Sequence, residues 1–293
     1  MYKRQIHYYS KKNFVDGFDK NKKPKPGQLF FSRSEEIVEH TFDCLCKNDT
    51  PDIVLISGDL TYNGERTSHD EMKAALKKLQ QKGKRVYVIT ATHDYTTPRM
   101  PTYGIDKNDK YIEVESVKRT QLLKYYGDFG YNNAIAKHKS TMSYVAQLAD
   151  GYRLFALNDD YGDPDCGFSD ELMNWVKTEA NNAKRDGQYI IAMTHHPLVP
   201  PSPIYTAVAK GDMLNDYELR SKQLSDLGFD FVLTGHTHMH NISYCKIGNK
   251  KFYDISTAAL TGFPPYYRQI VLNKEQKKAE IKTICADLSL IHI

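Results

Sequence analysis

The chain has 293 residues, of which 40% are hydrophobic and 26% are charged, and its formal net charge is +4. This length and composition allow one large hydrophobic core or two modest ones. No stretch approaches the roughly 18 apolar residues of a membrane span, and no apolar segment follows Met1, so we expect neither a membrane span nor a signal peptide. A cytoplasmic location is therefore expected for this form, or an exported one if the native N-terminus is longer.

The five cysteines are scattered along the chain and do not have the spacing of a zinc finger. We expect buried thiols in a reducing compartment. One basic cluster, at residues 18–28, mixes four lysines with prolines and a glycine. It is interpreted as a solvated loop in preference to a nucleic-acid patch, so no nucleic-acid partner is expected.

Helical and strand patterns alternate along the first two thirds of the chain. Apolar residues at helical spacing predict helices over residues 34–48, with Ser34 as the cap, and over 68–82 and 169–185. Short apolar runs predict buried strands over residues 52–57, 85–90, 189–194 and 229–233. Each helix leads into one of these strands, which is typical of a largely parallel sheet.

Residues 96–141 form a connection of unusual length, with one helix predicted at 116–126. Its tyrosines could line a substrate site or pack this segment onto the rest of the protein: Tyr103, Tyr111, Tyr125, Tyr126 and Tyr131. Beyond His240 the pattern changes to short alternating runs, which predict antiparallel strands over residues 242–247, 251–256, 267–272 and 278–284. No repeat or linker divides the chain, so we predict one domain over residues 1–293, with 96–141 inserted at an edge of the active site.

Aspartate and histidine residues follow all four predicted buried strands. They are Asp59, then His93 and Asp94, then His195, and finally the tetrapeptide Gly235-His236-Thr237-His238. The carboxyl ends of strands line the active-site crevice of open α/β sheets, so these side chains are expected to meet. Imidazole is a favoured ligand of zinc, iron, nickel and copper, and the glycine is expected to let the backbone turn sharply. The remaining histidines near these motifs are interpreted as structural or peripheral: His69, His196 and His240.

The order and spacing of these motifs resemble the calcineurin-like metallophosphoesterases, which read DxH, GD, GNH[DE], H and GHxH along the chain. Here the GD motif is Gly58-Asp59, the single histidine is His195, and the GHxH motif is intact. The resemblance runs from about residue 5 to residue 280 and is strongest to bacterial members whose first motif reads DIHY. It implies an α/β fold, a two-sheet αββα sandwich with mixed sheets and flanking helices. It also implies two divalent metals about 3.5–4 Å apart.

Two motifs depart from the family pattern. The first aligns with Gln5-Ile6-His7-Tyr8, where glutamine replaces an aspartate, and the third reads Ala91-Thr92-His93-Asp94, where threonine replaces an asparagine ligand. An amide or a hydroxyl is a neutral ligand, and ligand charge governs cation affinity. We therefore expect up to two divalent transition metals (Mn, Fe or Zn), of which one or fewer is tightly bound.

The residues ahead of the first motif are also unusual. Only residues 1–4 precede Gln5, and they are too polar for a central buried strand, which normally reads as a continuous hydrophobic run. Either the sequence begins one strand late, or this end of the protein has diverged.

The resemblance implies a role for each motif residue. Asp59 would bridge both metals, His7 and His238 would complete one site with the weak ligand Gln5, and His195 and His236 would complete the other with the weak ligand Thr92. A hydroxide between the metals would attack phosphorus. His93 would stabilise the phosphoryl oxygens and protonate the leaving oxygen, and Asp94 would orient the His93 ring.

These roles predict a metal-dependent phosphoesterase that hydrolyses a phosphomonoester or phosphodiester, with weakened metal binding if the two departures matter. The alternative is a non-catalytic family member that acts as a binding or structural protein. A nuclease or nucleic-acid binder is disfavoured because no clustered basic and aromatic surface is evident. The sequence does not name the substrate.

Overall fold

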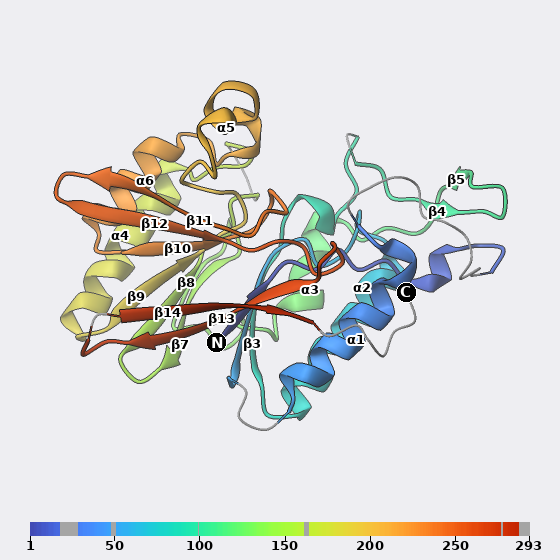
Figure 1. Cartoon of the computed structure of the whole chain (residues 1–293), viewed down its shortest axis with the longest axis horizontal. Coiled ribbons are helices and arrows are strands. Elements are labelled where there is room, and N and C mark those ends of the chain that lie inside the picture. The colour runs from blue at the N-terminus through green and yellow to red at the C-terminus, as the bar shows by residue number, and fades with distance from the viewer. Residues whose placement is uncertain (18–28, 48–50, 99, 161–163, 277, 287–293) are drawn as a thin grey trace.

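A computed structural model of the protein describes residues 1–17, 29–47, 51–98, 100–160, 164–276 and 278–286 (Figure 1). The basic cluster at 18–28 therefore lies outside the described residues. Two mixed sheets pack face to face, and helices cover their outer faces. The predicted αββα sandwich is confirmed.

The first sheet brings the two ends of the chain together. Its order is β14 (Lys278–Cys285), β13 (Tyr266–Asn273), β1 (Tyr2–Arg4), β2 (Ile53–Ser57) and β3 (Arg85–Ile89). The strands β1, β2 and β3 are parallel, whereas β13 runs antiparallel to both β1 and β14.

The second sheet has seven strands. Its order is β11 (Asn241–Ile247), β12 (Lys250–Ser256), β10 (Phe231–Thr234), β9 (Tyr189–Met193), β8 (Tyr152–Ala156), β7 (Ser143–Ala149) and β6 (Ala136–His138). The four central strands from β12 to β8 are parallel to one another. The antiparallel prediction therefore holds for β11, β13 and β14, but it is wrong for β12 against β10.

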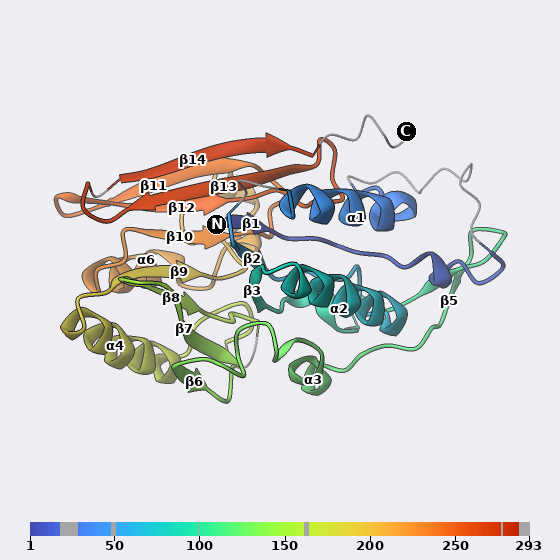
Figure 2. The same cartoon turned by 90° about the horizontal axis from the view of Figure 1, so that it is seen from below.

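The main helices match the predicted ones with shifted ends. They are α1 (Ser34–Leu45), α2 (Arg66–Gln81) and α4 (Asp170–Arg185). Figure 2 shows α1 and α2 together on one side of the molecule and α4 at its other end. The Ser169 side chain caps α4 by accepting from the Leu172 N–H, as a good N-cap does, whereas Ser34 lies inside α1 and bonds Tyr9 instead.

Strand alternation sorts apolar side chains into three buried clusters. Val54 and Ile56 of β2 face α1, α2 and α3 (Leu122–Tyr126), whereas Leu55 between them faces the other sheet. The outer face of the second sheet packs on α4 and α6 (Tyr217–Asp226). A period of two thus gives the central strands two buried faces, whereas the residues of the edge strands β11 and β14 are half-buried or exposed.

The short strand β1 corrects the expectation that residues 1–4 cannot form a central strand. Tyr2 packs its ring on Tyr267, at 5.3 Å between centroids, while Lys3 points between the sheets and is fully buried. Backbone pairing with β2 and β13 on both sides stabilises these three residues without an apolar run. Burial lowers the pKa of Lys3 well below its ordinary value of 10.5, with Asp254 opposing and Arg268 reinforcing the shift.

The 96–141 segment packs partly into the core. Residues 119–126 form a 3-10 turn followed by α3, a shorter helix than predicted. Tyr125 and Tyr126 are buried against the helices of the first sheet, which confirms the packing interpretation for these two. Tyr103 and Tyr111 instead contact each other with tilted rings, at 4.1 Å between centroids, at the hairpin of β4 (Gly104–Ile105) and β5 (Tyr111–Ile112).

The structure also tests the expectations of buried thiols and of no membrane span. None of the five cysteines forms a disulfide; four are half-buried and Cys285 is exposed, so the expectation of buried thiols is wrong. Within the described part of the chain, no helix is both long and apolar enough to span a bilayer.

We predict that Lys3→Met raises the free energy of unfolding by about 1 kcal/mol or more near neutral pH, because a buried amino group without a hydrogen-bond partner among the described residues is replaced by an apolar chain of similar length. Since the folded-state pKa of Lys3 is lowered, the penalty is present below the unfolded value of 10.5 and disappears above it. The gain in the variant should therefore shrink as pH rises, which urea unfolding at several pH values measures.

The control is Arg268→Met, which removes bonds from the guanidinium to the Ser256 and Asn241 carbonyls and should destabilise the protein. A loss of stability in Lys3→Met as large as in Arg268→Met would show that Lys3 is charged and paired with Asp254.

Candidate metal centre

Loops at the carboxyl ends of five parallel strands meet between the two sheets. The loop after β1 carries His7, the loop after β2 carries Asp59, and the turn after β3 carries His93. From the other sheet, His195 follows β9, and His236 and His238 follow β10. These motifs therefore meet at the carboxyl ends of the strands, as the sequence predicts.

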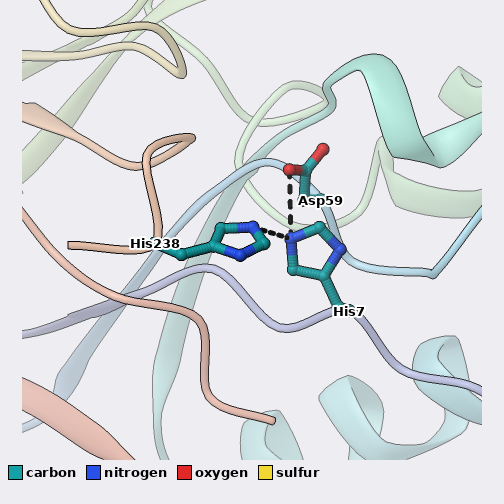
Figure 3. A group of neighbouring side chains, drawn as sticks. All are labelled: His7, Asp59 and His238. Carbon is teal, nitrogen blue, oxygen red and sulfur yellow. Dashed lines mark hydrogen bonds and ion pairs between the residues drawn. The ribbon is translucent and has the colours of Figure 1, made fainter. Parts of the chain in front are cut away.

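His7, Asp59 and His238 form the first cluster (Figure 3). The Nε2 atom of His7 lies 3.2 Å from Oδ2 of Asp59 and 2.9 Å from Nε2 of His238. Figure 3 shows the three side chains pointing toward one another from three separate segments. His7 and Asp59 are almost fully buried, so the contact between their polar atoms offsets the hydration that both side chains lose.

Asp59, His195 and His236 form the second cluster. Oδ2 of Asp59 is 3.1 Å from Nε2 of His195, and that nitrogen is 3.2 Å from Nδ1 of His236. The Ser57 carbonyl lies 2.7 Å from the other ring nitrogen of His195, which leaves Nε2 directed at the carboxylate. The same oxygen of Asp59 therefore belongs to both clusters.

Four of these residues adopt left-handed backbone conformations that side chains normally avoid. The φ angles are 58° at His7, 52° at Asp59, 62° at His236 and 54° at His238. Such a conformation costs about 1–2 kcal/mol per residue. Strain concentrated on convergent His and Asp residues is typical of a functional site.

The electrostatics favour an ionised carboxylate at Asp59, a protonated ring at His195 and neutral rings at His236 and His238. Burial opposes ionisation of Asp59, but the imidazoles of His195 and His7 hold its pKa well below the ordinary range. Burial also opposes charge on His195, yet Asp59 raises the pKa of this ring to about 9. Burial and neighbouring imidazoles hold the pKa of His236 well below its usual value and lower that of His238 to about 3. Neutral rings keep a lone pair available for a ligand.

The residues fit divalent transition metals. Two imidazole nitrogens bound tetrahedrally at about 2.0–2.1 Å from one zinc would lie about 3.3 Å apart. The nitrogen pairs here are 2.9 and 3.2 Å apart, and Oδ2 of Asp59 has no conventional hydrogen bond within the described structure. An imidazole-rich set with one carboxylate suits zinc or iron better than magnesium.

Two glycines are required by close contacts at the site. A Cβ on Gly58, whose φ is 88°, would lie 2.9 Å from Nδ1 of His195. A Cβ on Gly235 would lie 2.6 Å from Oε1 of Gln5. Gly235 is thus needed for close approach. The sharp turn expected of it is made by the left-handed His236 and His238.

The third motif places His93 at the site but gives Asp94 a different role from the expected one. Nδ1 of His93 lies 2.5 Å from the Tyr62 carbonyl and 2.8 Å from Oδ1 of Asn63, so these groups orient the ring. The Asp94 carboxylate accepts from the backbone N–H groups of Leu60, Thr61 and Ala91. The expectation that Asp94 orients His93 is wrong, because Asp94 instead holds the Asp59 loop against the third motif.

The two weak ligands differ in their placement. Oε1 of Gln5 accepts from the His236 N–H at 2.7 Å, and Nε2 of Gln5 is buried without a partner among the described residues. Gln5 thus reaches the centre as an anchor for the GHxH loop. Thr92 lies half-buried on the turn Thr92–Asp94, and neither cluster includes a contact from it.

Asp159 is a site residue that the sequence analysis missed. Its Oδ2 accepts from the N–H groups of His195 and His196, at 3.1 and 2.6 Å, and from the Thr194 hydroxyl at 2.8 Å. It follows β8 as Asp59 follows β2, so the rule of an apolar strand followed by an acid would have found it. The contacts fix the backbone on which His195 stands.

The other histidines surround the centre without joining its clusters. His69 is buried between Tyr126 and the Asp94 carbonyl, and burial lowers its pKa to about 3. His196 lies against His236, at 4.1 Å between ring centroids, so it is closer to the site than expected. His240 packs on Tyr266.

Comparison with known proteins agrees with this geometry. The model of the calcineurin-like phosphoesterase family matches residues 31–240, which include every motif except the first. No curated protein sequence matches the chain. Among solved structures, the chain is similar to a dimetal phosphatase from Danio rerio, with a TM-score of 0.61, 12% identity and 98% of each chain covered.

The chain is also similar to a Staphylococcus aureus protein provisionally described as a 5′-nucleotidase, solved in complex with α-ketoglutarate. The TM-score is 0.51 with 11% identity, and the match covers 100% of this chain and 55% of the other. At these identities the structural similarities show a shared fold. The family match spans most of the chain, so this protein belongs to the calcineurin-like phosphoesterase family.

Proposed function

We propose that the protein hydrolyses a small phosphomonoester or phosphodiester at a dinuclear metal centre. The observation that carries this proposal is the position of Oδ2 of Asp59, which lies 3.2 Å from His7 and 3.1 Å from His195. One carboxylate shared by two histidine clusters is the arrangement a two-metal site needs.

The histidines of the two clusters would bind one metal each and would share Asp59. His7 and His238 would hold one metal with Asp59, and His195 and His236 would hold the other. Bound divalent metals would supply Lewis acidity toward the phosphoryl oxygens and lower the pKa of a water nucleophile.

His93 is placed to act on the substrate. Its Nδ1 is engaged by the Tyr62 carbonyl, which makes Nδ1 the protonated nitrogen and leaves Nε2 as an acceptor in the neutral ring. Its ring centroid is 4.9 Å from that of His7, and burial lowers its pKa. A protonated His93 would donate from Nε2 to a phosphoryl or leaving oxygen, as a general acid does.

The first and third motifs favour the second candidate, a non-catalytic binding protein. The oxygen of Gln5 accepts a hydrogen bond from the His236 N–H, and Thr92 offers a short neutral hydroxyl where the family pattern has an asparagine. The first and third motifs therefore bring fewer oxygen ligands than the family pattern has. Metal occupancy and turnover distinguish the two candidates.

We predict that the purified protein retains about one tightly bound transition metal per chain, or fewer, because Asp59 is the single carboxylate in the two described clusters. Elemental analysis after dialysis against a mild chelator measures this occupancy. Two metals per chain that survive the chelator would contradict the prediction.

We predict that Asp59→Asn abolishes both metal binding and hydrolysis, because the amide keeps the size of the carboxylate but removes the charge that both clusters share. Zinc binding and turnover of an aryl phosphate are the measurements. Asp170→Asn, which changes an exposed aspartate at the start of α4, is the matched control and should behave as the parent protein. Hydrolysis that persists in Asp59→Asn would rule out the two-metal mechanism.

We predict that Asp159→Ala weakens zinc binding by about 10–100-fold, since it releases the backbone that carries His195 without touching a metal. Competition with a chromophoric chelator measures the affinity. Asp159→Asn keeps an oxygen acceptor and should retain most of the affinity, so equal losses in both variants would show that charge, and not the position of the loop, is responsible.

A further inference from the structure

A cavity of about 570 Å³ opens beside the candidate metal centre, and His238 contributes to its wall. This volume is in the range of pockets that hold small organic ligands. The wall continues from His238 through Met239 into the loop that carries Phe263 and Pro264. A group bound to phosphorus at the centre would therefore meet this cavity on the His238 side.

The lining is mostly aromatic and apolar, and its polar members are Thr237, His238 and His240. Phe30 and Phe263 make an edge-on ring contact at 5.8 Å, and Tyr205 of α5 (Pro203–Val208) donates its hydroxyl to the Met239 sulfur at 3.1 Å. Phe263 is 69% exposed and Met239 is 37% exposed, which leaves their apolar surface open to a ligand. Exposed large apolar side chains gathered beside a polar centre are typical of a binding site.

The described part of this wall carries no permanently charged side chain. Among the described residues that line the cavity there is no lysine, arginine, aspartate or glutamate. A second phosphate or a carboxylate would find no counter-ion here and would lose hydration without compensation. An uncharged group therefore fits these described residues better than a polyanion such as a nucleoside polyphosphate does.

We propose that this cavity binds the organic group of the substrate, and that this group is uncharged and aromatic. The assignment rests on the proposed phosphoesterase function, because it places the phosphoryl group at the metal centre. It deepens that function to hydrolysis of an aryl or arylmethyl phosphate ester. Aromatic rings and a thioether sulfur offer stacking and edge contacts to such a group.

A second aromatic row beside His93 is a competing location. Tyr62 stacks near His93, at 6.1 Å between centroids, and Tyr103 contacts Tyr62. Those hydroxyls bond each other at 3.1 Å, and Phe31 covers the other side of Tyr62 at 4.0 Å. The rings of this row are packed on one another, whereas the cavity beside His238 is open.

The test compares two phosphonates that cannot be hydrolysed, 1-naphthylmethylphosphonate and methylphosphonate, by calorimetry on zinc-loaded protein. The naphthyl compound should bind about tenfold tighter or more, as apolar groups do in a fitting pocket. Tyr205→Ala and Phe263→Ala should each reduce this preference. The matched control is Ile204→Ala, which removes an exposed neighbour of Tyr205 on α5 that does not line the cavity and should leave the preference unchanged.

Equal binding of the two phosphonates by the parent protein would overturn the proposal. A preference that survives both cavity variants would also overturn it and would point to the Tyr62 row. Hydrolysis of 1-naphthyl phosphate, measured in parallel, separates this proposal from the proposed function. A binding preference without hydrolysis would support the cavity and refute catalysis, and hydrolysis without a preference would refute the cavity alone.

Discussion

The Asp59 carboxylate, buried at the meeting point of two sheets, is the constraint on which the rest of the site depends. An isolated buried carboxylate is too costly to remain ionised, so it requires positive or metal partners on every open side. His7 approaches from the first sheet and His195 from the second, and each lies within 3.2 Å of the same oxygen. Neither sheet alone could hold this charge. The centre is therefore complete only where the two sheets pack together.

The backbone around the centre is fixed by buried acceptors that do not join the metal clusters. Asp94 accepts three backbone N–H groups near Asp59, and Asp159 accepts two beside His195. Gln5 does the same for His236. These bonds offset the strain of the left-handed residues, because a loop pinned at both ends cannot relax to a common conformation. At the position where the family pattern has an aspartate, Gln5 thus holds the backbone of the GHxH loop.

The surroundings of the centre are asymmetric. On the His93 side, tyrosines pack tightly on one another and orient the ring through the Tyr62 carbonyl. On the His238 side, an open apolar cavity adjoins the cluster. A substrate with one phosphoryl group and one uncharged ring matches this asymmetry, since the described residues of the cavity wall include no acidic or basic side chain of Asp, Glu, Lys or Arg.

The sequence by itself determined the family, the sandwich and which His and Asp residues converge. Strand periodicity and the motifs at strand ends are local signals, and parallel strands bring their carboxyl ends to one edge. Only the tertiary structure decided what each neighbour does. Lys3 lies in a central strand because the two flanking strands supply its backbone hydrogen bonds. The His93 ring is oriented by Tyr62 and Asn63, and the Asp94 carboxylate binds backbone N–H groups instead. Asp159 joins the site from a strand that carries no family motif. Each of these outcomes depends on groups distant in sequence, whose positions no local pattern encodes.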